Sequence, residues 1–176
     1  MIFKNKNVAI VGPATSLVGT GCGVEIDSFD LVVRHNNSYP VPTDLQFDYG
    51  SKCNVLFFNK FFINNFKSDV DFEKFGIHIL EKSNIYKKNY LKKALGSIPL
   101  SGTVLIDYIL SKSTNKIKIF GYDWYQEEIK WVPTYNDWRE GVESGPHIPE
   151  NDMRYLRNLM ELGKIEITES SKKYLI

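Results

Sequence analysis

The stretch NVAIVGPATSLVGTGCGVEIDSFDLVVRHN, residues 7–36, decides the fold class of this 176-residue chain. It begins with an apolar run, Asn7 to Gly12, that ends in Gly-Pro, which is typical of a buried strand stopped by a turn. The residues from Gly19 to Phe29 are glycine-rich at first and then helical in pattern, and Asp30 to Arg34 read as a second strand. This order of strand, helix and strand favours a parallel α/β sheet.

The rest of the chain continues the alternation. Pro99 to Gly102 open an apolar helix over 103–110, and KIKIF at 116–120 alternates as a strand does before Gly121. Further strands are expected at 53–58, 76–80 and 164–167, and further helices at 86–95, at 149–162 and in the C-terminal tail.

These elements predict one α/β domain over residues 1–176. Its fold is expected to be a Rossmann-like, mostly parallel sheet with helices on both faces. Residues 122–146 contain aromatic residues, Gly and Pro without clear periodicity. We expect this segment to form an active-site loop or lid.

Charge and hydropathy narrow the classes of partner. Lys and Arg number 22 against 21 Asp and Glu, so the net charge of +1 gives no electrostatic case for nucleic acid. No apolar run approaches the roughly 18 residues of a membrane helix. The two cysteines, Cys22 and Cys53, are expected to be free thiols in a reducing compartment. We therefore expect a soluble, cytoplasmic protein that is at most peripheral to a membrane.

A dinucleotide-binding domain is the first alternative for such a pattern, and its motifs are absent. The first strand is followed by Gly12-Pro13-Ala14-Thr15-Ser16-Leu17, which is not G-x-G-x-x-G, and the glycines at 19, 21 and 23 come too late for the tight turn. The second strand ends in Arg34-His35-Asn36 rather than in an acidic residue that would hold a ribose. A nicotinamide-dependent oxidoreductase is therefore disfavoured, and detectable NAD binding would restore it.

Polar and small residues follow the expected strands, where ligands bind in sheets of this kind. These positions are Gly12, residues 34–36, Asn59 and residues 121–125. Ser101-Gly102-Thr103 opens a helix with small residues, so its free N–H groups and the helix dipole suit a phosphate or carboxylate. The alternative for this stretch is a plain N-cap.

His147 is the leading candidate for a general base. It stands at the end of the long loop, after Pro146 and before a helix start, with Asp152 five residues later. The alternative is a surface histidine near a helix N-terminus. His35, at a strand end, fits either a functional or a structural role, and His78 lies within a strand and is expected to be structural.

One short motif resembles a metal site. Asp69-Val70-Asp71 has the Asp-x-Asp form that holds a metal in many nucleotide-sugar transferases, but it follows a polar stretch rather than a buried strand. We therefore assign no metal and expect no cofactor.

Three segments together resemble the sialyl motifs of glycosyltransferase family 29, the animal-type sialyltransferases. Residues 8–36 resemble the large motif, residues 99–102 with Ile119-Phe120-Gly121 resemble the small motif, and His147 with Asp152 resembles the very short motif. The residues that match the large motif are Val11-Gly12, Leu17, Gly19, Gly21, Gly23, Glu25-Ile26-Asp27-Ser28, Asp30, Arg34 and Asn36. The chain is also similar to bacterial family 42 at 52–59, 121–126 and 147–152.

This resemblance implies a single-domain GT-A-variant glycosyltransferase that uses CMP-sialic acid, or a related CMP-sugar with an acidic keto-sugar, without a metal. It implies inverting transfer to a hydroxyl of a glycan or glycolipid. By position, His147 would be the base, Asp152 would orient it, and Tyr125 would donate to the leaving phosphate. The donor would be bound by Gly12, Ala14, Asn36, Asn59, Ser101, Gly102, Gly121 and Tyr135.

The chain also departs from the family pattern. Pro13 stands where both families usually have an asparagine that contacts the donor phosphates, and the paired cysteines of the animal enzymes are absent. We also expect no membrane anchor of the kind that the animal enzymes have. The chain is shorter than usual between the motifs and in the lid. The acceptor site is therefore expected to be minimal, or to be completed in a homo-oligomer or by a partner chain. The alternative function is a CMP-binding relative that is non-catalytic or hydrolytic.

Overall fold

A computed structural model of the protein describes residues 2–36, 38–58, 72–85, 90–112, 114–127 and 147–176. Within these residues a six-stranded sheet has the order β4-β3-β2-β1-β5-β6, and every pairing in it is parallel. The strands are β1 (Asn7–Val11), β2 (Leu31–His35), β3 (Val55–Phe58), β4 (His78–Glu81), β5 (Lys116–Phe120) and β6 (Glu166–Ile167). The predicted parallel α/β sheet is thereby confirmed.

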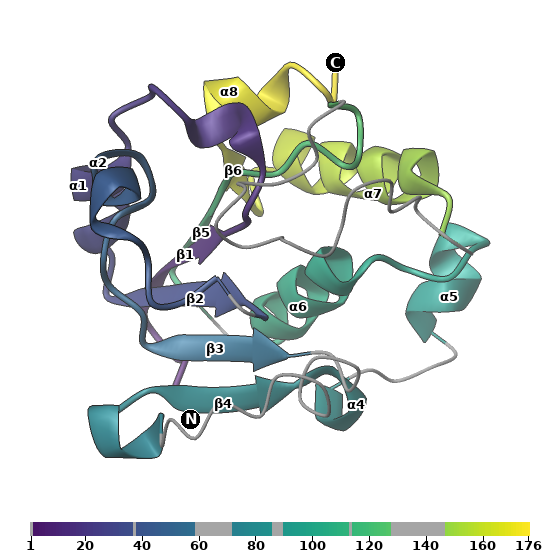
Figure 1. Ribbon diagram of the computed structural model, residues 1–176. Coiled ribbons are helices and arrows are strands. Elements are labelled where there is room, and N and C mark those ends of the chain that lie inside the picture. Colours follow the sequence, from purple (N-terminus) through teal and green to yellow (C-terminus); the bar gives the residue numbers. More distant parts are fainter. Residues whose placement is uncertain (1, 37, 59–71, 86–89, 113, 128–146) are drawn as a thin grey trace.

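Helices cover both faces of this sheet, as expected (Figure 1). They are α1 (Gly23–Asp27), α2 (Gln46–Tyr49), α4 (Lys82–Ile85), α5 (Tyr90–Leu95), α6 (Ser101–Leu110), α7 (Pro149–Glu161) and α8 (Glu169–Lys172). Short 3₁₀ turns lie at Thr15–Leu17, Thr43–Leu45 and Glu73–Phe75.

Alternation along β1 sends its side chains into two separate cores. Val8 and Ile10 pack with α6 and α7 on one face, through Leu105 and Leu156 among others. Ala9 and Val11 pack on the other face, in the cluster that includes Ile26 of α1 and Tyr49 of α2. Because successive residues of a strand point to opposite faces, an unbroken apolar run such as VAIV is what a strand buried on both sides requires.

The strand order reverses at β1, since β2 lies on one side of it and β5 on the other. At such a point the loops that follow two neighbouring strands diverge, and in open α/β sheets ligands bind there. The residues that follow β1 and β5 are Gly12 and Gly121. Gly12 and Gly121, predicted from the sequence to follow strands, thus lie at the edge where ligands bind in open α/β sheets.

Some boundaries differ from those expected. The segment expected to be glycine-rich at first and then helical forms helix α1 only from Gly23, because Gly19 and Gly21 adopt φ of 76° and 66°, which a helix does not allow. Of the helix expected at 86–95, Tyr90–Leu95 lies in the described residues. The segments α2 and α4 were not predicted; each has four residues, too few to show helical periodicity.

Within the described residues, none of the helices has both the length and the apolar character needed to cross a membrane.

Candidate active site

The loop after β1 and the turn after β5 are bonded together at the carboxyl edge of the sheet. The N–H of Gly12 donates to Phe120 O at 2.8 Å, and the N–H of Ala14 donates to Gly121 O at 3.1 Å. A Cβ at Gly12 would lie 2.3 Å from Gly121 O, so no larger residue fits there. Gly121 itself has φ of 65°, which favours glycine. Both glycines thus allow the two loops to meet closely.

Tyr122, the residue after Gly121, lies close to both Gly12 and Gly102. A Cβ at Gly102 would lie 2.5 Å from Cε1 of Tyr122, so the ring rests directly on the first turn of α6. The Tyr122 hydroxyl is hydrogen-bonded to Nε2 of His35, the last residue of β2. Burial lowers the pKa of His35 to about 4 and raises the pKa of Tyr122, so both groups are neutral at pH 7.

The N-terminus of α6 presents backbone donors. Leu100 is its N-cap residue, and Ser101, Gly102 and Thr103 form its first turn. The intrahelical bonds begin with Val104 N–H to Leu100 O, so the N–H groups before it have no intrahelical acceptor. Ser101 is not the N-cap, and an apolar N-cap has no side-chain oxygen. The plain N-cap alternative is therefore wrong, and the arrangement suits an anion.

Asp152, in the first turn of α7, ties that helix to the start of α6. Its Oδ1 accepts the N–H of Leu100 at 3.0 Å, and its side chain is fully buried. Burial raises the pKa of this carboxyl, while the Thr103 hydroxyl, the Leu100 N–H and the charges of His147 and Lys82 act in the opposite direction. Asp152 is thus a buried carboxyl group that accepts a backbone N–H at the start of α6 and lies near Lys82 and His147.

His147 is held by the same loop. Its Nδ1 lies 2.8 Å from the carbonyl oxygen of Ile98, two residues before Leu100. A carbonyl only accepts hydrogen bonds, so Nδ1 carries the proton and Nε2 of the neutral ring is an acceptor. This is the tautomer that a general base needs. Because the Nδ1 bond goes to Ile98, the effect of Asp152 on His147 comes through its charge.

The other predicted site residues have different surroundings. Asn36 follows β2 with φ of 47°, and its N–H donates to Phe57 O at 2.7 Å. Ala14 is buried; besides its N–H bond, its carbonyl accepts the hydroxyl of Tyr49 at 2.6 Å, so its backbone supports the loop. The ring of Tyr125 packs against the core between the sheet and α6. Asn59, Tyr135 and Asp69-Val70-Asp71 lie outside the described residues.

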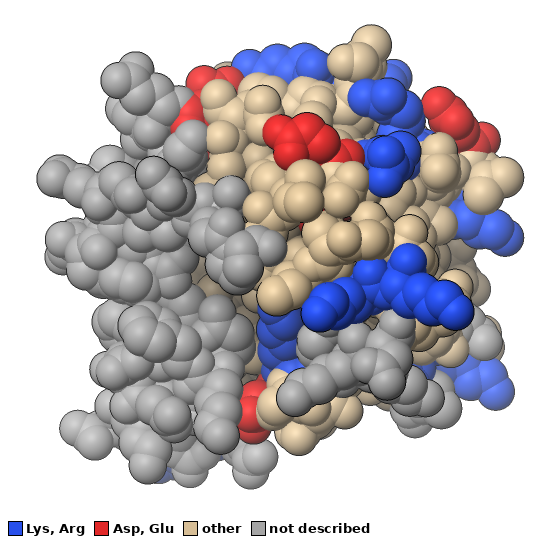
Figure 2. All heavy atoms as spheres, turned by 90° about the vertical axis from the view of Figure 1, so that its right-hand side faces the viewer, with Lys and Arg blue, Asp and Glu red and all other residues tan. Residues whose placement is uncertain are grey.

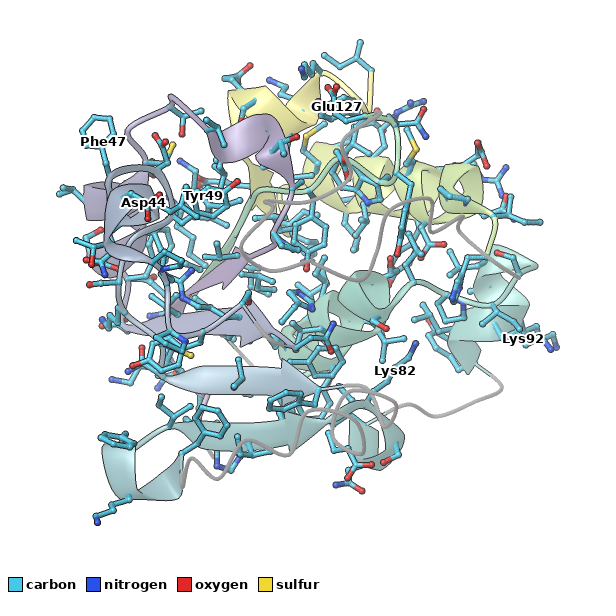
Figure 3. The ribbon with its side chains drawn as sticks, viewed as in Figure 1. Asp44, Phe47, Tyr49, Lys82, Lys92 and Glu127 are labelled. Carbon is cyan, nitrogen blue, oxygen red and sulfur yellow. The ribbon has the colours of Figure 1, made fainter. Side chains whose placement is uncertain are left out.

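Of the predicted lid at residues 122–146, the structure describes only residues 122–127. Its beginning is fixed to α8 and the residues after it. Tyr122 N–H donates to Ser171 Oγ at 3.0 Å, and Glu127 pairs with Lys173 at 3.3 Å and with the Tyr174 hydroxyl (Figure 3).

Two residues of the strongest matching motif are structural. The carboxylate of Asp27 accepts the N–H groups of Ser51 and Lys52 at 2.9 Å each. Although burial alone would raise the pKa of Asp27, these bonds and the charge of Arg34 lower it overall. Arg34 is buried and donates to the carbonyls of Tyr49 and Lys52 at 2.8 Å each. Both therefore hold the segment before β3 against the sheet.

The cysteines are both free thiols, as predicted. Burial raises the pKa of Cys53 to about 12, so it remains protonated and unreactive at pH 7. In the described part of the chain there is no group of three or more His, Cys, Asp or Glu residues that could hold a metal ion.

Sequence reasoning did not assign Tyr122 or Lys82 to the site and left His35 undecided. The nearest signal was position, because all three stand at or directly after a strand end: His35 ends β2, Tyr122 follows β5 by two residues, and Lys82 follows β4. The strand-end positions considered in the sequence already included residues 34–36 and 121–125, and extending them to the residue after the fourth strand would have added Lys82.

Comparisons with known proteins agree with this architecture. The sequence model described as "Glycosyltransferase family 29 (sialyltransferase)" matches residues 4–120, and no curated protein matches the chain. A crystal structure of a mammalian sialyltransferase superimposes with a TM-score of 0.63 at 19% identity, over 94% of this chain and 69% of that one. A mammalian sialyltransferase in complex with Gal-beta-1-3GalNAc-ortho-nitrophenol gives 0.64 at 18% identity, over 94% and 70%. The family match covers more than half of the residues, and the chain therefore belongs to glycosyltransferase family 29, the sialyltransferases, and is a glycosyltransferase.

Proposed function

We propose that this glycosyltransferase moves sialic acid, or a related acidic keto-sugar, from a CMP-sugar donor to a hydroxyl of a glycan or glycolipid, with inversion and without a metal. Family membership supports the donor class. The observation that carries the catalytic part is the hydrogen bond between His147 Nδ1 and Ile98 O, just before α6. It puts the proton of the neutral ring on Nδ1, so Nε2 would serve as the proton acceptor.

The reaction follows from these groups. The acceptor hydroxyl attacks the anomeric carbon of the donor sugar while its proton passes to Nε2 of His147. The bond between the anomeric carbon and the phosphate oxygen breaks, and CMP leaves with the electron pair. A helix N-terminus favours the negative charge that develops on that phosphate, since its N–H groups and dipole are fixed in advance.

The donor would be held at the carboxyl edge of the sheet. Ser101 and Gly102 would bind it through hydroxyl and backbone groups, and Asn36 together with Asn59 would contact the nucleotide and sugar. Tyr125 would donate to the leaving phosphate. These roles rest on motif position, and the free first-turn N–H groups of α6 support those of Ser101 and Gly102.

Two observations support a second function, a CMP-binding relative that does not transfer the sugar. The ring of Tyr122 covers Gly102, and Pro13 replaces the asparagine that the family resemblance leads one to expect. A donor that needs both positions would meet a reduced site. Such a protein would bind CMP, and its rate of CMP release would be independent of any acceptor.

The test is release of CMP from CMP-sialic acid by the purified chain in EDTA, with and without a mixed panel of glycans. Release that increases with an acceptor and persists in EDTA supports metal-independent transfer. CMP binding with no acceptor-stimulated release supports the second function. Absence of both CMP and CMP-sialic acid binding would overturn the proposed donor class.

A further inference from the structure

Lys82 reaches the first turn of α6 from the end of the edge strand β4. It is the first residue of α4, directly after the edge strand β4, and its Nζ lies 3.1 Å from Oγ of Ser101. Figure 3 shows its side chain extending from α4 toward α6. The hydrogen bond joins residues 19 positions apart in the sequence, so it is set by the tertiary fold.

The placement of this ammonium group opposes two ordinary electrostatic preferences. A cation is disfavoured at a helix N-terminus, because the helix dipole is positive there. Lys82 is also partly buried, and this burial lowers its pKa, against the opposing charge of Asp152. Asp152 is one carboxylate facing a lysine, the α6 N-terminus and His147. An anionic ligand at the N-terminus of α6 would offset both effects.

The hydrogen bond also decides which way the Ser101 hydroxyl acts. A lysine ammonium has three donors and no acceptor, so Ser101 Oγ must be the acceptor in this pair. The proton of that hydroxyl is then directed away from Lys82 and can be donated. Ser101 thereby joins the first-turn N–H groups of α6 as a donor.

We propose that Lys82 is a positioning and specificity residue of the donor site: it sets the Ser101 hydroxyl as a donor and supplies the positive charge for an oxyanion of the donor. This inference rests on the proposed function and adds to it a residue outside the matched motifs. The oxyanion is either the phosphate of CMP or the carboxylate of the acidic sugar, which share this chemistry.

The experiment measures binding of CMP, CMP-sialic acid and cytidine to the wild type, Lys82→Met, Lys82→Arg and Lys82→Gln. Lys92→Met is the matched control, because Lys92 is an exposed lysine of α5 that points outward in Figure 3. The face that carries α5 and α7 has many basic side chains (Figure 2), so this control also removes one positive charge from the same side of the molecule. Urea unfolding of each variant checks the fold.

For a charge-assisted hydrogen bond we expect Lys82→Met to weaken CMP binding about 10- to 100-fold. Cytidine, which has no phosphate, should bind the variant and the wild type equally. Lys82→Arg should restore part of the affinity because it keeps the charge, and Lys92→Met should change nothing. A loss seen with CMP-sialic acid and not with CMP identifies the sugar carboxylate as the oxyanion.

Two outcomes would overturn the inference while the proposed function stands. In the first, the wild type binds CMP, and the folded Lys82 variants bind both CMP and CMP-sialic acid as tightly as the wild type does. In the second, the affinities of the Lys82 variants for CMP and for cytidine fall by the same factor, which indicates a structural role. If Lys82→Met does not fold, Lys82→Gln decides between the same outcomes. If the wild type binds neither CMP-sialic acid nor CMP, the proposed function is overturned, and this inference with it.

Discussion

The ring of Tyr122 lies against the Cα of Gly102, so close that a methyl group there would be 2.5 Å from Cε1 of the ring. The contact joins the turn after β5 to the first turn of α6. We expect Gly102→Ala to lower the free energy of unfolding by about 1–2 kcal/mol, because overpacking outweighs the gain in helix propensity. Urea denaturation measures this difference.

Removal of the ring should reverse that effect. In a Tyr122→Ala background the added methyl has room, so Gly102→Ala should be neutral or stabilising by up to about 1 kcal/mol. An equal loss in both backgrounds would contradict the contact. The same double-mutant cycle tests whether Tyr122 limits donor binding, since a smaller residue there would also open the α6 N-terminus.

The buried His35 should make stability fall in mild acid. Its folded pKa of about 4 lies below the ordinary value of 6.5, so the unfolded chain binds a proton first as pH falls. The stabilising contribution is complete above about pH 6.5 and is lost as pH approaches 4. Between pH 7 and pH 5 it should amount to about 2 kcal/mol.

The measurement compares unfolding free energies at pH 7 and pH 5 for the wild type and His35→Gln, which keeps a polar partner for Tyr122. The variant should lose less stability over this range than the wild type. His78→Gln is the control, because His78 is exposed on the edge strand β4. If His35→Gln and the wild type lose the same amount, His35 does not titrate as the structure implies.

The carboxylate of Asp48 should be needed to hold the glycine loop between the 3₁₀ turn at Thr15–Leu17 and α1. Its two oxygens accept the N–H groups of Gly19 and Gly21, at 2.8 Å each. An amide has one acceptor oxygen, so Asp48→Asn leaves one of these donors without its partner. We expect a loss of about 1–3 kcal/mol in unfolding free energy.

Asp44 provides the matched control for this change. It lies four residues earlier, is exposed and is labelled in Figure 3. Asp44→Asn should alter stability by less than about 0.5 kcal/mol, as is usual for a surface substitution. Similar values for the two variants would show that the loop does not depend on Asp48.

Long periodic segments could be predicted from the sequence because their residues carry the pattern themselves. The strand β1 and the helices α6 and α7 are each within a residue or two of the expected bounds. The four-residue helices α2 and α4 were not predicted, since one turn has no period, whereas the equally short α8 was expected in the C-terminal tail. Their position depends on packing against distant residues, as Asp27 and Arg34 illustrate for the segment that follows α2.

Candidate site residues could be predicted where a motif coincides with the start of a helix. Ser101, Gly102 and His147 were expected from sequence, and the structure gives the first two free backbone donors and the third a defined tautomer. The contacts of Tyr122 and Lys82 were not expected, because each joins α6 to a segment far from it in sequence. Such contacts follow from strand order, which the sequence did not specify.

The most direct test of the central claim is the rate of acceptor-dependent CMP release by His147→Ala, measured beside the wild type and His78→Ala with CMP affinity determined for each. If His147 Nε2 takes the acceptor proton, the rate falls about 10²- to 10⁴-fold while CMP affinity stays the same, and His78→Ala retains the wild-type rate. Full acceptor-dependent transfer by His147→Ala would contradict the account.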